Sequence, residues 1–174
     1  MIEIRGHGRG GQGIVTAMEL LAKAVFEQGK YPLAFPKFGP ERSGAPVEAY
    51  CRIDDERILL RTQVYEPDYL IVLDSSLVSV VDIAKGLKKD SVIVINAKER
   101  EKIGPYKVHY VDATKIAVEI LGRPIVNTAI LGAFAKVTGI VKMENLEKAV
   151  NERFQGSLAE KNIQAMKRAF DEVL

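Results

Sequence analysis

Short apolar runs alternate along the chain with segments in which apolar residues recur at helical spacing. The apolar or alternating runs predict strands at residues 2–5, 31–35, 47–53, 69–73, 92–95 and 107–111. Helical spacing predicts helices at residues 14–26, 77–87, 116–121, 128–137, 146–154 and 157–173. This alternation predicts one α/β domain over residues 1–174, with a mostly parallel sheet and a helical C-terminal third.

One part of the predicted sheet is antiparallel. Val47, Ala49, Cys51 and Ile53 alternate with polar residues, which is the pattern of a half-buried strand. The acidic residues at 54–56 suit a turn, so residues 57–61 are expected to return and complete an inserted β-hairpin. The preceding segment, residues 36–46, holds three Pro and two Gly and is therefore predicted to be a loop.

Composition excludes several classes of function. The 174 residues carry 25 Lys and Arg against 23 Asp and Glu, and a net charge of +2 gives no support to nucleic-acid or membrane binding. One Cys and two His cannot form an internal disulfide or hold an ordinary iron–sulfur cluster. No run approaches the roughly 20 apolar residues of a membrane span, and residues 1–5 do not resemble a signal peptide. We therefore expect a cytoplasmic location.

A glycine-rich segment joins the first strand to the first helix. Its sequence, Gly6-His-Gly-Arg-Gly-Gly-Gln-Gly13, fits the pattern G-x-G-x-x-G twice. Glycines let backbone N–H groups approach a phosphate, the following helix adds the positive end of its dipole, and Arg9 adds a charge. The segment therefore predicts a site for an anionic ligand, or an equivalent interface. The alternative is a tight turn that only connects the two elements.

The neighbouring residues narrow the choice of anion. A P-loop requires Lys and Ser or Thr after the last Gly, but Ile14 and Val15 follow here. NAD is disfavoured because residues 33–37 contain no carboxylate for the ribose hydroxyls. Lys37 and Arg42 suit an additional phosphate, as in NADP or coenzyme A. The alternative for both is a solvated charge in a loop.

Two further groups of residues are candidates for the site. Glu41 and Arg42 lie in a loop bracketed by Pro and Gly, which is either stiff and functional or simply irregular. They either contact a substrate or partner or form an exposed charge pair. Asp74, Asn96 and Asp112 each close a predicted strand, so they are expected to share the sheet edge at which α/β proteins bind ligands. The alternative for the two aspartates is that they cap the helices that follow.

The remaining candidates have structural interpretations. His7 is expected to shape the glycine loop, His109 to lie at the surface of a strand, and Cys51 to fill a small core position. Asn127 is predicted to cap the helix that starts after it, and Ser157 to open the last helix through a capping box. Neither a catalytic triad nor a paired-carboxylate motif is recognisable.

Four segments together resemble the gamma subunits of 2-oxoacid:ferredoxin oxidoreductases, most closely those of pyruvate-converting enzymes. They are residues 4–13, 34–46, 66–69 and 123–129, and the likeness spans essentially the whole chain in the same order. The resemblance implies a Rossmann-like α/β module within a complex of alpha, beta, gamma and delta subunits. Such a complex converts pyruvate, coenzyme A and oxidised ferredoxin to acetyl-CoA, CO2 and reduced ferredoxin.

The resemblance also implies that other chains hold the thiamine diphosphate and the iron–sulfur clusters, so this chain alone binds no cofactor and supplies no catalytic residue. We hypothesise that its glycine segment and second loop face the shared active site, where they place coenzyme A or close the pocket. The residues concerned are Gly6, Gly8, Arg9, Gly10, Gly11, Gln12, Gly13, Glu41, Arg42, Ser43 and Gly44. The alternatives are a free-standing NADP-binding reductase and a subunit whose loops serve assembly alone.

Overall fold

The computed structural model describes residues 1–37, 43–100 and 102–174, and these residues form an α/β domain. The strands are β1 (Ile2–Arg9), β2 (Tyr31–Pro36), β3 (Pro46–Asp54), β4 (Tyr69–Val72), β5 (Val92–Asn96) and β6 (Lys107–Val111). The helices are α1 (Ile14–Phe26), α2 (Ala113–Leu121), α3 (Ala129–Thr138), α4 (Met143–Arg153) and α5 (Gly156–Glu172), with a 3-10 turn, η1 (Ser75–Ser79).

The strands form one mixed sheet in the order β2-β3-β1-β4-β5-β6. β1, β4, β5 and β6 run parallel, whereas β3 is antiparallel to both β1 and β2. The predicted α/β class, with its mostly parallel sheet and helical C-terminal third, is confirmed. The carboxyl ends of the parallel strands therefore lie along one edge, close to the start of α1.

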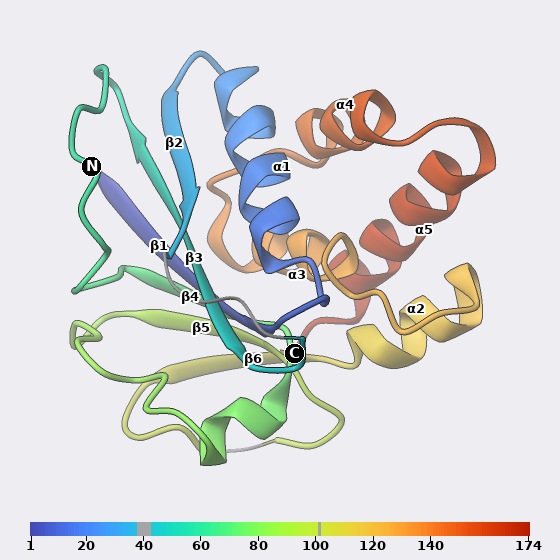
Figure 1. Cartoon of the computed structure of the whole chain (residues 1–174). Coiled ribbons are helices and arrows are strands. Elements are labelled where there is room, and N and C mark those ends of the chain that lie inside the picture. Colours follow the sequence, from blue (N-terminus) through green and yellow to red (C-terminus); the bar gives the residue numbers. More distant parts are fainter. Residues whose placement is uncertain (38–42, 101) are drawn as a thin grey trace.

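Two cores cover the two faces of this sheet. Figure 1 shows α1, α3, α4 and α5 on one side and η1 with the turns that follow it on the other. Alternate residues of β4 divide between the cores, with Ile71 facing the helices and Leu70 and Val72 facing the opposite side. Burial on both faces explains why this strand is a continuous apolar run.

The first strand is longer than predicted. β1 continues through Gly6, His7 and Gly8 to Arg9, so only residues 10–13 form the turn before α1. A Cβ atom on Gly6 would lie 2.6 Å from Cδ1 of Ile14 and 2.8 Å from Cε of Met18. The first glycines therefore let α1 pack closely on the strand, and the prediction that they lie in a loop was wrong.

The inserted hairpin also differs from the prediction. β3 pairs with the preceding strand β2, in a register from Tyr31 opposite Asp54 to Pro36 opposite Ala49, and residues 57–61 form no strand. Arg52 supplies the reason, because its buried guanidinium donates to the carbonyl oxygens of residues 60, 62 and 63. These carbonyls accept hydrogen bonds from a side chain and are therefore not available to pair with a neighbouring strand.

Two helix predictions need correction. The expected helix at 77–87 is the short 3-10 turn η1 followed by irregular turns, and Arg5 Nη2 donates to the carbonyls of Ile83 and Lys85 at 2.9 and 2.7 Å. Those carbonyls cannot then serve a regular helix. α5 begins at Gly156 without a side-chain cap, so Ser157 lies inside the helix and does not open a capping box.

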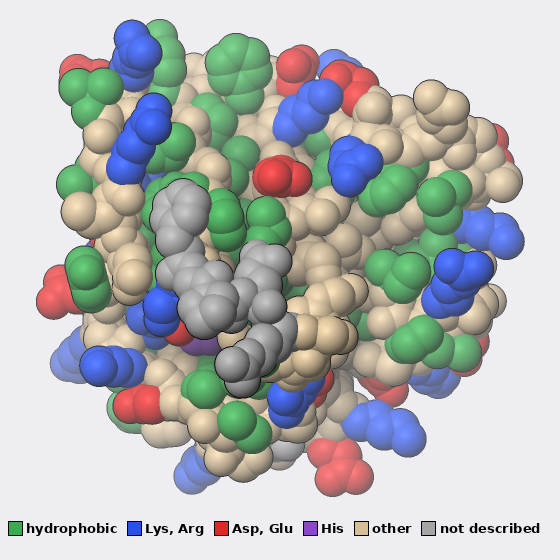
Figure 2. Space-filling view, in the orientation of Figure 1, with side chains coloured by type: hydrophobic (Ala, Val, Ile, Leu, Met, Phe, Trp, Pro, Cys, Tyr) green, Lys and Arg blue, Asp and Glu red, His purple; other side chains and the backbone are tan. Residues whose placement is uncertain are grey.

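The surface is mixed in charge. Figure 2 shows Lys and Arg side chains lying among Asp and Glu side chains across the visible face, in line with the net charge of +2. Within the described parts of the chain, no helix combines the length and apolar character needed to cross a membrane.

Candidate functional site

The glycine turn, residues 10–13, lies between the end of β1 and the start of α1. Two hydrogen bonds between Arg9 and Gln12 hold the turn together. Gln12 N–H donates to the Arg9 carbonyl at 2.9 Å, and Gln12 Oε1 accepts from Arg9 N–H at 2.7 Å. Gly13 has a φ of 79°, a left-handed conformation that favours glycine, and it provides no side-chain cap.

The start of α1 is suited to an anion. The first turn contains no acidic residue, and its leading N–H groups have no partner within the helix. The N–H groups of Gly11 and Gly13 likewise donate to no acceptor among the described residues. Free backbone donors at the positive end of a helix dipole are the features that bind phosphate or carboxylate.

Arg9 is committed to the protein itself. Its guanidinium donates to Asp74 Oδ2 at 3.1 Å, to the Gly44 carbonyl at 3.1 Å and to Ser76 Oγ at 2.8 Å. Burial alone would raise the pKa of Asp74, but hydrogen bonds from Ser76 and Gln12, together with the Arg9 charge, hold that pKa below its ordinary value. Arg9 therefore fastens the glycine turn and has its charge balanced by a carboxylate.

The second predicted loop meets the glycine turn at its described end. Gly10 N–H donates to the Ala45 carbonyl at 2.9 Å, and Gly44 N–H donates to the Gly10 carbonyl at 3.2 Å. Ser43 and Gly44 are exposed beside these contacts. The structure thus brings together the two segments that sequence reasoning had joined in one hypothesis, whereas Glu41 and Arg42 lie outside the described residues.

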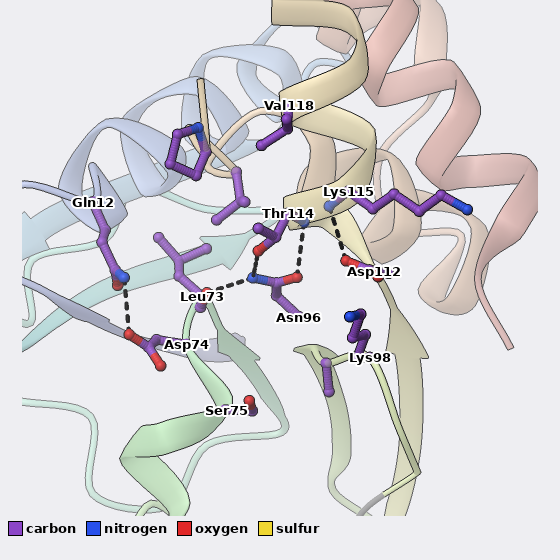
Figure 3. Close-up of a pocket in the computed structure, with 13 residues that line it drawn as sticks. Gln12, Leu73, Asp74, Ser75, Asn96, Lys98, Asp112, Thr114, Lys115 and Val118 are labelled. Atoms are coloured by element: carbon purple, nitrogen blue, oxygen red, sulfur yellow. Dashed lines mark hydrogen bonds between the residues drawn. The ribbon is translucent and has the colours of Figure 1, made fainter. Parts of the chain in front are cut away.

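A cavity of about 990 Å³ opens beside the glycine turn, at the carboxyl ends of the parallel strands (Figure 3). Asp74, Asn96 and Asp112 all line it, as expected from their positions at strand ends. The apolar residues of its lining are Leu73, Ala97, Val118, Pro124 and Val126. The cavity is therefore an amphipathic hollow at the usual ligand edge of an α/β sheet.

The side chains at the strand ends also stabilise the fold. Asp74 caps η1 and Asp112 Oδ1 accepts from Lys115 N–H at 2.9 Å, so the capping interpretation is confirmed for both. Asn96 Nδ2 donates to the Leu73 carbonyl at 2.9 Å, and its Oδ1 accepts from Thr114 N–H at 3.1 Å. These groups shape the cavity while most of their hydrogen-bonding capacity is used inside the protein.

Two lysines of this cavity were missed by the sequence analysis. Lys98 and Lys115 line the hollow, and neither belongs to the ion pairs formed within the described chain. Lys98 lies two residues after β5, and Lys115 lies in the first turn of α2. Lys37, which sequence reasoning favoured, does not line the cavity and pairs with Glu48 at 3.0 Å.

The predicted structural residues divide into confirmed and corrected cases. Cys51 is buried, and burial raises its pKa to about 12, which confirms a core position and makes the thiol a poor nucleophile. His109 is half-buried, with Nδ1 3.1 Å from the Leu174 carbonyl. Asn127 does not cap α3, whose N-cap is Thr128, and its Nδ2 lies 3.4 Å from the Gly13 carbonyl.

His7 lies in β1 and is only 3% exposed. Burial is the main cause that lowers its pKa to about 4, so the imidazole is neutral near pH 7. Its Nε2 has no hydrogen-bond partner. Among the described residues, no group of three or more His, Cys, Asp and Glu is arranged to hold a metal ion.

Known proteins match the whole fold and not only the glycine turn. A family model described as pyruvate ferredoxin/flavodoxin oxidoreductase matches residues 3–172. Pyruvate synthase subunit PorC of Methanothermobacter thermautotrophicus is 58% identical over 173 residues, covering 99% of this chain and 96% of that protein. The pyruvate/ketoisovalerate oxidoreductases common subunit gamma of Thermococcus kodakarensis is 54% identical, covering 100% and 98%.

Solved structures agree with these sequence matches. The crystal structure of the pyruvate oxidoreductase subunit PORC from Thermotoga maritima has a TM-score of 0.90 and 39% identity, covering 99% of this chain and 97% of that one. These names support the subunit interpretation and give no support to a free-standing NADP-binding reductase. The chain belongs to the pyruvate ferredoxin/flavodoxin oxidoreductase family, within which it is of the gamma-subunit type.

Proposed function

We propose that the chain is the gamma subunit of a cytoplasmic complex that converts pyruvate, coenzyme A and oxidised ferredoxin to acetyl-CoA, CO2 and reduced ferredoxin. The likeness to PorC and gamma subunits along nearly the full chain supports this assignment. Alpha, beta and delta subunits are the proposed partners, and ferredoxin is proposed to interact with the assembled complex. The role of this chain is to shape a binding surface, because its residues supply no recognisable nucleophile or acid–base pair.

The residues of the chain do not fit an iron–sulfur cluster. An iron–sulfur cluster normally requires several thiolate ligands, whereas the chain has one Cys, which is buried among core residues. We therefore assign the clusters and thiamine diphosphate to the partner subunits.

The observation that carries the site proposal is the cavity beside the glycine turn. Its apolar lining residues suit a flat aromatic base, while Lys98 and Lys115 supply positive charge and form no direct ion pair within the described chain. The free N–H groups of Gly11 and Gly13 lie in the neighbouring glycine turn. Coenzyme A combines an adenine ring with a diphosphate and a 3′-phosphate, so it is the substrate of the reaction that this arrangement fits.

The two loops have a supporting role in this proposal. Arg9 is a positioning residue, because its three hydrogen bonds hold the glycine turn, the Gly44 segment and η1 in one arrangement. Ser43 and Gly44 would close the pocket beside coenzyme A, whereas the predicted contribution of Glu41 and Arg42 to coenzyme A binding rests on the sequence alone. The 2-oxoacid itself is assigned to other subunits.

The test is steady-state kinetics of the assembled enzyme with Lys98→Gln and Lys115→Gln. Loss of one partly exposed ionic contact should raise the apparent KM for coenzyme A roughly three- to tenfold. The KM for pyruvate and the kcat at saturating coenzyme A should stay unchanged. Lys89→Gln removes the same charge from an exposed residue that does not line the cavity, and it is the matched control.

Arg9→Ala tests the positioning role in the same assay. It should also raise the KM for coenzyme A, since the glycine turn loses its three anchors. An unchanged KM for coenzyme A in both lysine variants would refute the proposed site. Failure of the Arg9 variant to enter the complex would instead favour a role in assembly alone.

A further inference from the structure

A hollow of about 320 Å³ lies at the end of the sheet opposite the glycine turn. β1 and β2 both begin at this end, beside the last residues of β3, whereas the glycine turn follows the end of β1. Figure 1 shows the end of α1, the start of β2 and the turn after β3 together at this end, in the upper left of the view. The hollow is therefore separate from the proposed coenzyme A site.

Three large apolar side chains line this hollow and are exposed to solvent. The exposed fractions are 60% for Phe26, 48% for Tyr31 and 79% for Leu59. Figure 2 shows apolar side chains beside Lys and Arg side chains in this region of the surface. Single exposed apolar residues are ordinary, but a group of them around one hollow is typical of a surface that another molecule covers.

The segment of residues 57–61 borders the hollow with its backbone unpaired. It contains no helix, strand, turn or bend, and its N–H groups donate to no acceptor in the described chain. Arg52 fixes its position by donating to the carbonyls of residues 60, 62 and 63. A straight, fixed segment with free N–H groups is suited to pair with an extended strand of a partner.

The free edge of β2 is less suited to such pairing. Lys37 N–H donates to the Glu48 carbonyl at 2.9 Å, so the odd-numbered residues of β2 face β3 and the even-numbered residues face away. Two of the three outward positions are Pro32 and Pro36, which have no N–H group to donate. Residues 57–61 are therefore the better backbone for a partner strand at this end of the molecule.

The hollow is positively charged. Arg57 and Arg61 line it, no Asp or Glu belongs to its described lining, and neither arginine forms an ion pair or side-chain hydrogen bond within the described chain. A partner that fits this surface presents carboxylates beside apolar side chains.

The acidic residues nearby do not neutralise these arginines. Asp54 pairs with the N-terminal amine, and Asp55 pairs with Lys30. Glu27 and Glu56 are exposed but do not line the hollow. A second copy of the chain docked here by two-fold symmetry would set the same arginines against each other, so the charges favour a different chain as the partner.

We propose that this surface docks another subunit of the enzyme through an extended segment in which apolar and acidic residues lie together. The inference rests on the proposed place of the chain in a multi-subunit complex. Apolar side chains of the segment pack against Phe26 and Leu59, and its carboxylates pair with Arg57 and Arg61. Its backbone carbonyls accept hydrogen bonds from the free N–H groups of residues 57–61.

The experiment is a competition for assembly. Wild-type and variant chains are expressed together with the remaining subunits, the complex is purified through a tag on a partner subunit, and mass spectrometry gives the ratio of the two chains. Leu59→Asp should be depleted at least about tenfold, because a carboxylate replaces an apolar contact. Arg61→Glu should be depleted by a similar factor, because it sets like charges against each other.

Conservative variants are the matched controls. Leu59→Met keeps the apolar contact and Arg61→Lys keeps the charge, so both should assemble as well as the wild type. Lys89→Glu reverses an exposed charge outside the hollow and should also assemble normally. Urea unfolding of each variant should match that of the wild type, because the altered side chains are exposed.

Two further measurements identify the occupant. A photoreactive benzophenone amino acid in place of Leu59 should cross-link to a partner segment that contains both apolar and acidic residues. The amides of residues 57–61 should exchange with deuterium at least about tenfold more slowly in the complex than in the isolated chain. A cross-link to a second copy of this chain, or to a segment without carboxylates, would overturn the proposal, as would unchanged exchange at residues 57–61.

The competition also separates this inference from the proposed function. If the wild-type chain enters no complex, the subunit assignment and the docking surface fail together. If the complex forms and Leu59→Asp enters it as often as the wild type, the docking surface alone is wrong.

Discussion

Acidification from pH 7 to 4.5 should destabilise the folded chain chiefly through His7. This side chain is 3% exposed, and burial lowers its pKa to about 4. The charge of Glu48 opposes the shift and the charges of Arg5 and Lys37 add to it. In the unfolded chain the same imidazole has an ordinary pKa of about 6.5. Between these two values the unfolded chain therefore binds a proton that the folded chain excludes.

The sign and size of the effect follow from this difference. The contribution of His7 to stability is complete above about pH 6.5 and is lost as the pH falls toward 4. One pKa unit corresponds to about 1.4 kcal/mol, so the full loss is about 3 kcal/mol. Most of it, about 2 to 3 kcal/mol, should be lost by pH 4.5.

Carboxyl groups change the stability of the folded chain at lower pH than His7 does. Burial alone would raise the pKa of Glu48, but hydrogen bonds from Lys37 and Tyr50 hold it below its ordinary value of 4.5. A carboxyl group with a depressed pKa loses its contribution only as the pH falls below that ordinary value. The range from pH 6.5 to 4.5 therefore reports mainly on histidine.

The assay is urea unfolding at several pH values, for the wild-type chain, His7→Gln and His109→Gln. His109 is the only other histidine, and burial lowers its pKa too, so its variant separates the two contributions. The His7 variant should lose most of the dependence on pH between 6.5 and 4.5. Full retention of that dependence in His7→Gln would refute the reasoning, as would a His7 NMR resonance that titrates near pH 6.5.

Three further substitutions test the fold by urea unfolding. Arg52→Leu leaves Glu3 without its 2.8 Å partner and three carbonyls without donors, and should cost about 3 to 5 kcal/mol; a loss below 1 kcal/mol would contradict the assigned contacts. Gly13→Ala places a side chain at a φ of 79° and 2.6 Å from the Asn127 amide, so at least about 1 to 2 kcal/mol should be lost, and wild-type stability would contradict this. Asp112→Ala removes the cap of α2 and should cost about 1 kcal/mol, with Asp112→Asn restoring most of it; equal losses in both variants would argue against the cap.

The parallel part of the fold was predictable because burial of a strand on both faces produces a recognisable local pattern of apolar residues. β4 and β5 are covered on both faces and appear as unbroken apolar runs. The hairpin was misplaced because the residues after β3 are held by Arg52, a charged residue that is 1% exposed and donates to carbonyls 8 to 11 residues further along the chain. Local patterns treat such a residue as a surface position. The length of β1 was underestimated because Gly6 and Gly8 indicate a loop by themselves.

The candidate site was predictable only in part, for a similar reason. The glycine turn and the strand ends, Asp74, Asn96 and Asp112, follow from topology, and the structure places these three side chains around one cavity. The role of Arg9 was not predictable, since its partner Asp74 lies 65 residues away along the chain. Lys98 was missed because a single lysine after a strand has no distinguishing pattern.

The central claim is that this chain works as one part of a multi-subunit oxidoreductase. The most direct measurement is anaerobic affinity purification of the tagged chain from its own cells, with every co-purifying protein identified by mass spectrometry. We expect stoichiometric recovery with a thiamine diphosphate-binding chain and a cysteine-rich, ferredoxin-like chain. Recovery of the chain alone, under conditions in which coenzyme A-dependent pyruvate oxidation persists in the unbound fraction, would contradict it.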